Sequence, residues 1–134
     1  IESGARQPMF NDVALTADGG FYTTEMYNIM TPFEQVAAAG VEGKDTGVVW
    51  HWTADSGFAP VAGSVGSFPN GIVINDAEDT LYVNYWFSGL TIKLDIKSGD
   101  VLAKHQGGRA DNLTLVDGAV WAAKHDMTLD FWIQ

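Results

Sequence analysis

Residues 68–86, "FPNGIVINDAEDTLYVNYW", decide the fold of this chain. Ile72 and Ile74 occupy alternate positions after a proline–glycine break, and an aromatic run ending in Trp86 follows, which is typical of two half-buried strands. The acidic stretch Asp76–Asp79 separates the two runs, so the pattern predicts a β-hairpin. Asn70 stands at the start of the first strand, where a carboxamide does nothing for strand formation.

The same arrangement occurs three times along the chain. The three segments are "NDVALTADGGFYTTEM" from Asn11, "NGIVINDAEDTLYVNYW" from Asn70 and "DNLTLVDGAVWAAKH" from Asp111. Each segment begins with a small polar residue that can offer an oxygen, and continues through alternating apolar residues and an Asp- or Gly-rich turn to an aromatic strand. The distance from Asn70 to Asp111 is 41 residues, the usual size of a four-stranded propeller blade.

Further strands complete these units. The patterns are "VVWHW" from Val48 and "FAPVAG" from Phe58 in the first unit, and "LTIKLDI" from Leu90 and "VLAKHQ" from Val101 in the second. The outer pair of the third unit begins near Met127 and stops. The sequence therefore predicts one all-β domain over 1–134, a partial β-propeller of about two and a half to three four-stranded blades out of six. The expected blades cover about 9–64, 68–107 and, incompletely, 109–134, and a β-sandwich is the competing fold.

A complete propeller has about four to eight blades, so this chain cannot close the ring by itself. We expect the remaining blades to come from a longer chain or from a second copy.

An insertion in the first unit has a helical pattern. "MTPFEQVAAAG" predicts a helix near residues 31–40, with Thr31 as the cap, Pro32 at the first helical position and Gly40 at the end. Glu34 would complete a capping box. The helix would fall between the second and third strands of its blade, so we expect it at one end of the propeller, as a lid or rim element.

The composition excludes several functions. Seventeen acidic and seven basic residues give a net charge of -10, which argues against nucleic acid or an anionic membrane as partner and favours a cation. No apolar run is long enough to span a bilayer. The chain has no cysteine, so thiolate metal sites are excluded, although this does not fix the compartment.

The repeated polar residues have a possible common role. The first strand of a propeller blade is innermost, so we expect Asn11, Asn70 and Asp111 to face the central channel from successive blades. Their oxygens, with that of Asn112, would form a hard-oxygen set suited to calcium. The alternative is that each residue only caps a turn by bonding nearby backbone groups.

Three motifs, taken in order, resemble the paraoxonase/arylesterase family. They are "PMFNDVALTADGGFYTTEMY", "GSFPNGIVINDAEDTLYVNYW" and "RADNLTLVDGAVWAAKHD". This family lies within the superfamily of gluconolactonase, regucalcin and strictosidine synthase-like proteins. The resemblance implies a six-bladed propeller with calcium in its channel and hydrolysis of lactones or aryl esters.

The resemblance also implies roles for individual residues. It places Asn11, Asn70, Asp111 and Asn112 around a catalytic calcium, Asp12 at a second, structural calcium, and His125 in the wall of the active-site pocket. In gluconolactonase-like relatives the position of Asp111 is also a proposed general base. The glutamate ligand and the histidine dyad of paraoxonases have no counterpart in this sequence, so the chain would hold a half-site.

Two functional hypotheses follow. The first is a calcium-dependent hydrolase acting on a small-molecule ester or lactone, with Asp111 and His125 as its catalytic residues; the lack of a Gly-x-Ser-x-Gly motif removes the usual serine esterase arrangement. The second is a non-catalytic propeller fragment, stabilised by calcium, that acts as a binding or assembly module.

Overall fold

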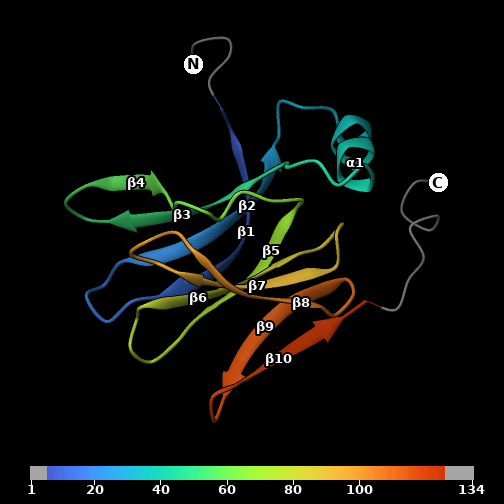
Figure 1. The fold of residues 1–134 in the computed structure, drawn as a ribbon. Helices are drawn as coiled ribbons and strands as arrows, with labels where there is room; N and C mark the ends of the chain where they lie inside the picture. The colour runs from blue at the N-terminus through green and yellow to red at the C-terminus, as the bar shows by residue number, and fades with distance from the viewer. Residues whose placement is uncertain (1–5, 126–134) are drawn as a thin grey trace.

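The computed structural model describes residues 6–125, which form three antiparallel sheets and one helix (Figure 1). The elements are β1 (Pro8–Leu15), β2 (Phe21–Asn28), α1 (Phe33–Val41), β3 (Val48–Thr53), β4 (Gly57–Pro60), β5 (Pro69–Ile74), β6 (Thr80–Tyr85), β7 (Leu90–Asp95), β8 (Val101–Gln106), β9 (Ala110–Val116) and β10 (Ala119–Lys124). The sheets have the orders β1-β2-β3-β4, β5-β6-β7-β8 and β10-β9. This confirms the predicted partial β-propeller. The expected continuation of the third blade near Met127 lies outside the described residues.

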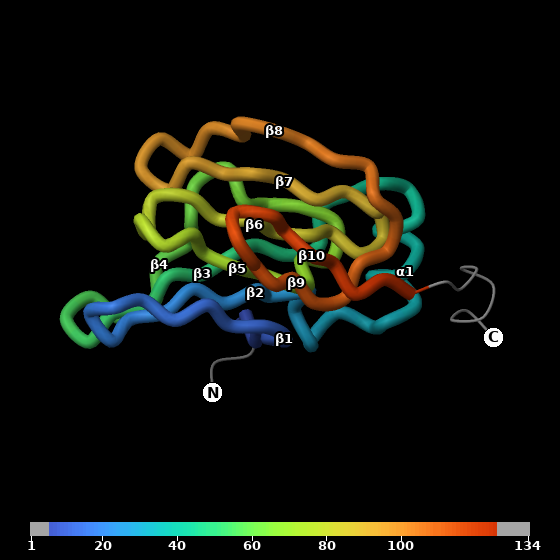
Figure 2. Tube along the Cα trace, turned by 90° about the horizontal axis from the view of Figure 1, so that it is seen from below, coloured from blue at the N-terminus to red at the C-terminus, as the bar shows by residue number. Residues whose placement is uncertain are grey.

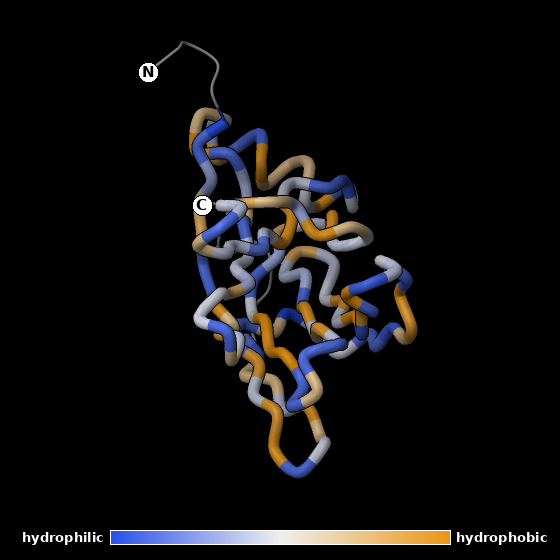
Figure 3. Tube along the Cα trace, turned by 90° about the vertical axis from the view of Figure 1, so that its left-hand side faces the viewer, coloured by the Kyte–Doolittle hydropathy of each residue, from blue (hydrophilic) through white to orange (hydrophobic). Residues whose placement is uncertain are grey.

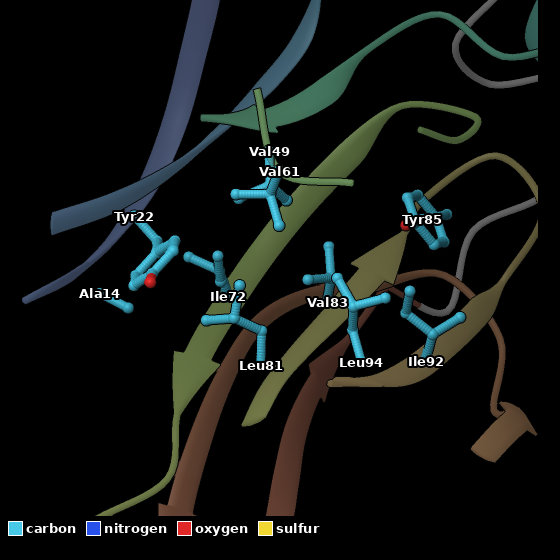
Figure 4. Packing of buried hydrophobic residues seen from close by; sticks show 10 residues of the cluster. All are labelled: Ala14, Tyr22, Val49, Val61, Ile72, Leu81, Val83, Tyr85, Ile92 and Leu94. Carbon is cyan, nitrogen blue, oxygen red and sulfur yellow. The ribbon is translucent and has the colours of Figure 1, made fainter. Parts of the chain in front are cut away.

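The sheets pack through a shared apolar core. Tyr22 and Val49 from the first sheet meet Ile72, Leu81 and Val83 from the second, and Leu81, Val83 and Val49 are fully buried (Figure 4). Because side chains of a strand alternate between the two faces, each sheet can give one apolar face to the next sheet. Hydrophobic and hydrophilic residues are interspersed along the whole described chain (Figure 3).

The inner strands of the three sheets are neighbours. Strand β5 packs between β1 and β9, and the β9–β10 hairpin lies across β5 and β6 (Figure 2). Gly71 permits the close approach of β5 to β9, because a Cβ there would overlap the backbone oxygen of Asp111 and lie 2.6 Å from Oδ1 of Asn84. The start of β5 is thereby brought beside the start of β9.

Helix α1 forms where the sequence predicts it, but its ends differ from the prediction. The N-cap residue is Pro32, which has an extended ψ of 136°, and no side chain caps the helix, so the predicted Thr31 cap is wrong. The Pro32 carbonyl itself accepts the first hydrogen bonds, from the amides of Gln35 and Val36. Because Pro32 is extended rather than helical, the helix begins one residue later than predicted.

Gly40 lies inside the helix rather than at its end. A Cβ at this position would overlap the ring of Phe87, so the glycine lets α1 pack closely on the segment after β6. The helix continues to Val41, and Glu42 is its C-cap. A residue that signals a helix end in the sequence therefore serves a tertiary contact here.

The two terminal sheets leave apolar side chains exposed. The exposed large residues include Phe10, Val13, Leu15 and Phe58 on the first sheet and Val116 and Trp121 on the β9–β10 hairpin. In a closed propeller such faces pack on neighbouring blades, so their exposure agrees with a ring that the described residues do not close. Residues 6–125 contain no helix that is long and apolar enough to cross a membrane.

Candidate active site

A bulge interrupts the inner strand of each sheet at the repeated polar residue. At each bulge, two residues of the inner strand lie opposite a single residue of the second strand. These are Asn11–Asp12 opposite Thr24, Asn70–Gly71 opposite Asn84, and Asp111–Asn112 opposite Ala123. A bulge of this kind bends the strand and re-aims its side chains. The three positions aligned by the sequence repeat are thus also equivalent in the structure.

The residues opposite two of these bulges connect successive sheets. Thr24 donates its hydroxyl proton to the backbone oxygen of Asn70 at 2.5 Å, and the side-chain amide of Asn84 donates to the backbone oxygen of Ala110. Both side chains are almost fully buried. Neither residue was singled out from the sequence; the available signal was a buried polar residue in the second strand of the first two repeats, opposite the repeated polar residue.

A cavity of about 280 Å³ opens beside the second and third bulges. Its lining residues come from α1, both ends of the β5–β6 hairpin, β9 and the end of β10: Phe33, Ala37, Phe68, Asn70, Trp86, Phe87, Asp111 and His125. Helix α1 and the end of β10 lie at the same end of the molecule (Figure 2). The structure therefore brings together three of the predicted site residues, Asn70, Asp111 and His125.

Asn70 lines this cavity and has an unsatisfied side-chain oxygen. Its side chain is buried, with 5% exposure, and its Oδ1 has no hydrogen-bond partner among the described residues. Leaving a buried acceptor unpaired costs about 1–3 kcal/mol. An asparagine that serves only as a turn former would bond a nearby backbone group, and this oxygen has no such bond among the described residues.

Asp111 and His125 form the second polar part of the cavity wall. Nε2 of His125 lies 3.6 Å from Oδ2 of Asp111, and both side chains are about one-third exposed. The backbone amide of His125 donates to the carbonyl of Arg109 at 2.9 Å, which ties the end of β10 to the start of β9. The pair is close enough to share a ligand atom or a water molecule.

The remaining wall is aromatic. The Phe87 ring stands edge-on to Phe68, with ring centroids 5.0 Å apart, and edge-on to Trp86 at 5.2 Å. Phe68 adopts a left-handed backbone conformation (φ 62°), which is uncommon for a bulky residue and turns the chain into the start of β5. Phe33 and Ala37 of α1 complete this side, so the predicted rim helix contributes directly to the cavity.

The other predicted site residues do not line the cavity. Asn11 is exposed, and its amide nitrogen contacts the sulfur of Met26 at 3.5 Å; Asn112 is also exposed. The Asp12 carboxylate accepts hydrogen bonds from the amides of Val13 at 2.8 Å and of Ile72 at 3.0 Å. Asp12 therefore joins the first sheet to the second through its side chain.

The residues present fit calcium as part of a ligand set. Among residues 6–125, no three His, Cys, Asp or Glu side chains gather closely enough to hold a metal ion. A calcium at this cavity would depend on amide and carboxylate oxygens together. The unpartnered Oδ1 of Asn70 is an amide oxygen, and Asp111 offers a carboxylate. Calcium takes about six to eight oxygens, so these two residues could supply only some of them.

Sequence reasoning also missed the role of Trp86. Its indole nitrogen donates to Nδ1 of His125 at 3.0 Å, 39 residues away in the chain. No local pattern could have linked the two residues.

The fold and this cavity define a partial β-propeller with an apolar pocket and convergent polar groups at its inner strands. The chain is similar to the solved structure of XC5397 from Xanthomonas campestris, a gluconolactonase, with a TM-score of 0.64 and 18% sequence identity. The likeness covers 92% of this chain and 44% of that protein, so this chain spans under half of its length. At this identity the likeness shows the fold alone. No protein-family model and no curated protein sequence matches the chain.

Proposed function

We propose that this chain supplies half of the active site of a calcium-dependent hydrolase that acts on lactones or aryl esters. The observation that carries the proposal is the buried, unpartnered Oδ1 of Asn70 on the same aromatic-walled cavity as Asp111 and His125. The fold shared with a gluconolactonase supports lactones as the first substrates to test.

The chain's own groups are suited to ester chemistry. Asn70 and Asp111 would hold the calcium, which when bound would polarise the carbonyl of the substrate. A carboxylate oxygen of Asp111 would accept a proton from water as the water oxygen adds to the carbonyl carbon. That proton would pass to the alkoxide or phenoxide oxygen when the carbon–oxygen bond breaks, and His125 would provide a second polar group beside the reacting atoms.

The apolar wall favours a substrate with an apolar substituent. Phe33, Phe68 and Phe87 offer carbon surface, and a cavity of about 280 Å³ has room for a small ring or aryl group. An aryl ester or an alkyl-substituted lactone would place this substituent against the rings and its carbonyl near Asn70 and Asp111.

The test is hydrolysis of phenyl acetate and of an alkyl-substituted lactone by the complete assembly that closes the ring, with calcium and with a chelator. We expect the chelator to abolish turnover and Asp111→Ala to lower kcat/KM by about 100-fold or more. Asp55→Ala is the matched control, because Asp55 is exposed in the β3–β4 hairpin and does not line the cavity.

Turnover that survives both the chelator and Asp111→Ala would contradict the proposal. Stabilisation by calcium without any turnover would instead support the alternative of a non-catalytic binding module.

A further inference from the structure

Trp86 makes a directional contact with the imidazole of His125. The indole Nε1–H donates to Nδ1 of His125 at 3.0 Å, and Trp86 is buried, with 6% exposure. The indole nitrogen can only donate a hydrogen bond, so Nδ1 must act as the acceptor through its lone pair.

This contact decides which nitrogen of a neutral imidazole carries the proton. When Nδ1 accepts, the proton of the neutral ring is on Nε2. Nε2 is the atom that lies 3.6 Å from Oδ2 of Asp111. The network therefore points an N–H group, and not a lone pair, towards the carboxylate side of the cavity.

We propose that Trp86 is a positioning residue that holds His125 in the Nε2–H tautomer. In this tautomer His125 serves the cavity as a hydrogen-bond donor, to Asp111 or to an oxygen of the substrate, and its proton stays on Nε2. Proton acceptance from water then falls to Asp111. The catalytic half of this inference rests on the proposed function, whereas the tautomer does not.

Both partners of the contact are held by the fold. The backbone amide of Trp86 donates to the carbonyl of Phe68 at 3.0 Å, and its ring packs edge-on against Phe87. The guanidinium of Arg109 lies over the same ring, 5.5 Å from its centroid. Since the backbone of His125 is tied to Arg109, the two rings are fixed from β6 and from the β9–β10 hairpin together.

The direct test is nitrogen NMR of His125 in the 134-residue chain, at a pH where the ring is neutral. We expect Nε2 to show the signal of a protonated nitrogen, Nδ1 that of an acceptor, and a scalar coupling between Nδ1 and Nε1 of Trp86 across the hydrogen bond. A proton on Nδ1 in the unaltered protein would overturn the inference without any variant.

Variants extend the test. Trp86→Phe keeps a ring but removes the donor, so we expect His125 to shift to a mixture of tautomers, whereas Trp121→Phe, at an exposed position of β10, should leave the signals unchanged. An unchanged single Nε2–H tautomer in Trp86→Phe would contradict a positioning role.

The catalytic half has its own readout. Loss of one hydrogen bond predicts that Trp86→Phe lowers kcat by about threefold to tenfold with little change in KM. His125→Gln, whose amide can still donate near the Nε2 position, should retain more activity than His125→Leu; equal and complete loss in both would contradict the donor role. If the complete assembly hydrolyses nothing, the proposed function fails, while the NMR result still decides the tautomer.

Discussion

The starts of β1 and β5 occupy equivalent positions of the repeat, yet their polar residues have different surroundings. Asn11 is exposed, whereas Asn70 is buried and presents an unpartnered oxygen to a cavity. Both residues lie at a bulge of the inner strand. Among the inner strands of the described residues, β5 contacts both β1 and β9, whereas β1 contacts β5. Asn70 thus lies between two neighbouring blades, whereas Asn11 has a neighbouring blade on one side only within the described residues.

The largest expected effect comes from placing a charge at the buried position. Without calcium, Asn70→Asp should lower the free energy of unfolding by about 3–5 kcal/mol, because a carboxylate would be buried beside Asp111 without a cation. Calcium should restore most of this loss. Denaturant unfolding with and without calcium measures both effects.

The equivalent change in the first repeat is the control. Asn11→Asp should alter stability by no more than about 0.5 kcal/mol, because the side chain is exposed. Equal effects of the two substitutions would show that the two strand starts do not differ as described.

The next largest loss of stability is expected at Gly71, where β5 approaches β9 closely. Gly71→Ala should cost about 1–3 kcal/mol, since the new Cβ would overlap the backbone oxygen of Asp111 and force β5 and β9 apart. Thr114→Ala, at an exposed position of β9, is the reference. A neutral Gly71→Ala in denaturant unfolding would mean that β9 does not pack on β5 in this register.

A similar or smaller loss is expected at the first strand start, where the polar side chain joins two sheets. Asp12→Ala should cost about 1–2 kcal/mol, because the amide of Ile72 loses its acceptor. The exposed Asp76 in the β5–β6 hairpin provides the control, Asp76→Ala. Thermal unfolding that is the same for both variants would argue against the link between the sheets.

The smallest effect is expected at the hairpin turns, where the two repeats behave alike. Hydrogen bonds from the side chain of Thr16 and the amide of Gly20 lower the pKa of Asp18, and bonds from Asn75 and Thr80 lower that of Asp79. A lowered folded pKa adds stability above the ordinary aspartate pKa, and this stability is lost as pH falls through the folded pKa.

We therefore expect Asp18→Asn and Asp79→Asn each to flatten slightly the dependence of stability on pH in the acid range. Unfolding curves recorded from neutral pH down to acid pH measure the slope. A steeper dependence of stability on pH in either variant would contradict a lowered pKa of that aspartate in the folded protein.

The local part of this fold could be predicted from the sequence. The alternation at Ile72 and Ile74 and the Asp- and Gly-rich turns depend on neighbouring residues, so the hairpins and the partial propeller followed from pattern alone. The helix was located for the same reason, although its Thr31 cap failed because Pro32 itself is extended and takes the N-cap position.

The site was less predictable because it depends on contacts between blades. The repeat aligned Asn11 with Asn70 but could not show that only Asn70 is enclosed. The hydrogen bond from Trp86 to His125 spans 39 residues and arises from the packing of the β9–β10 hairpin on the second sheet. Such long-range contacts leave no periodic signal in the sequence.

The most direct test of the central claim is a crystal structure of the full chain grown with calcium, with anomalous data to identify the ion. The account predicts one calcium within about 2.3–2.6 Å of both the side-chain oxygen of Asn70 and a carboxylate oxygen of Asp111. A map with no ion at the cavity, or with the amide of Asn70 bonded to the backbone and turned away from Asp111, would contradict it.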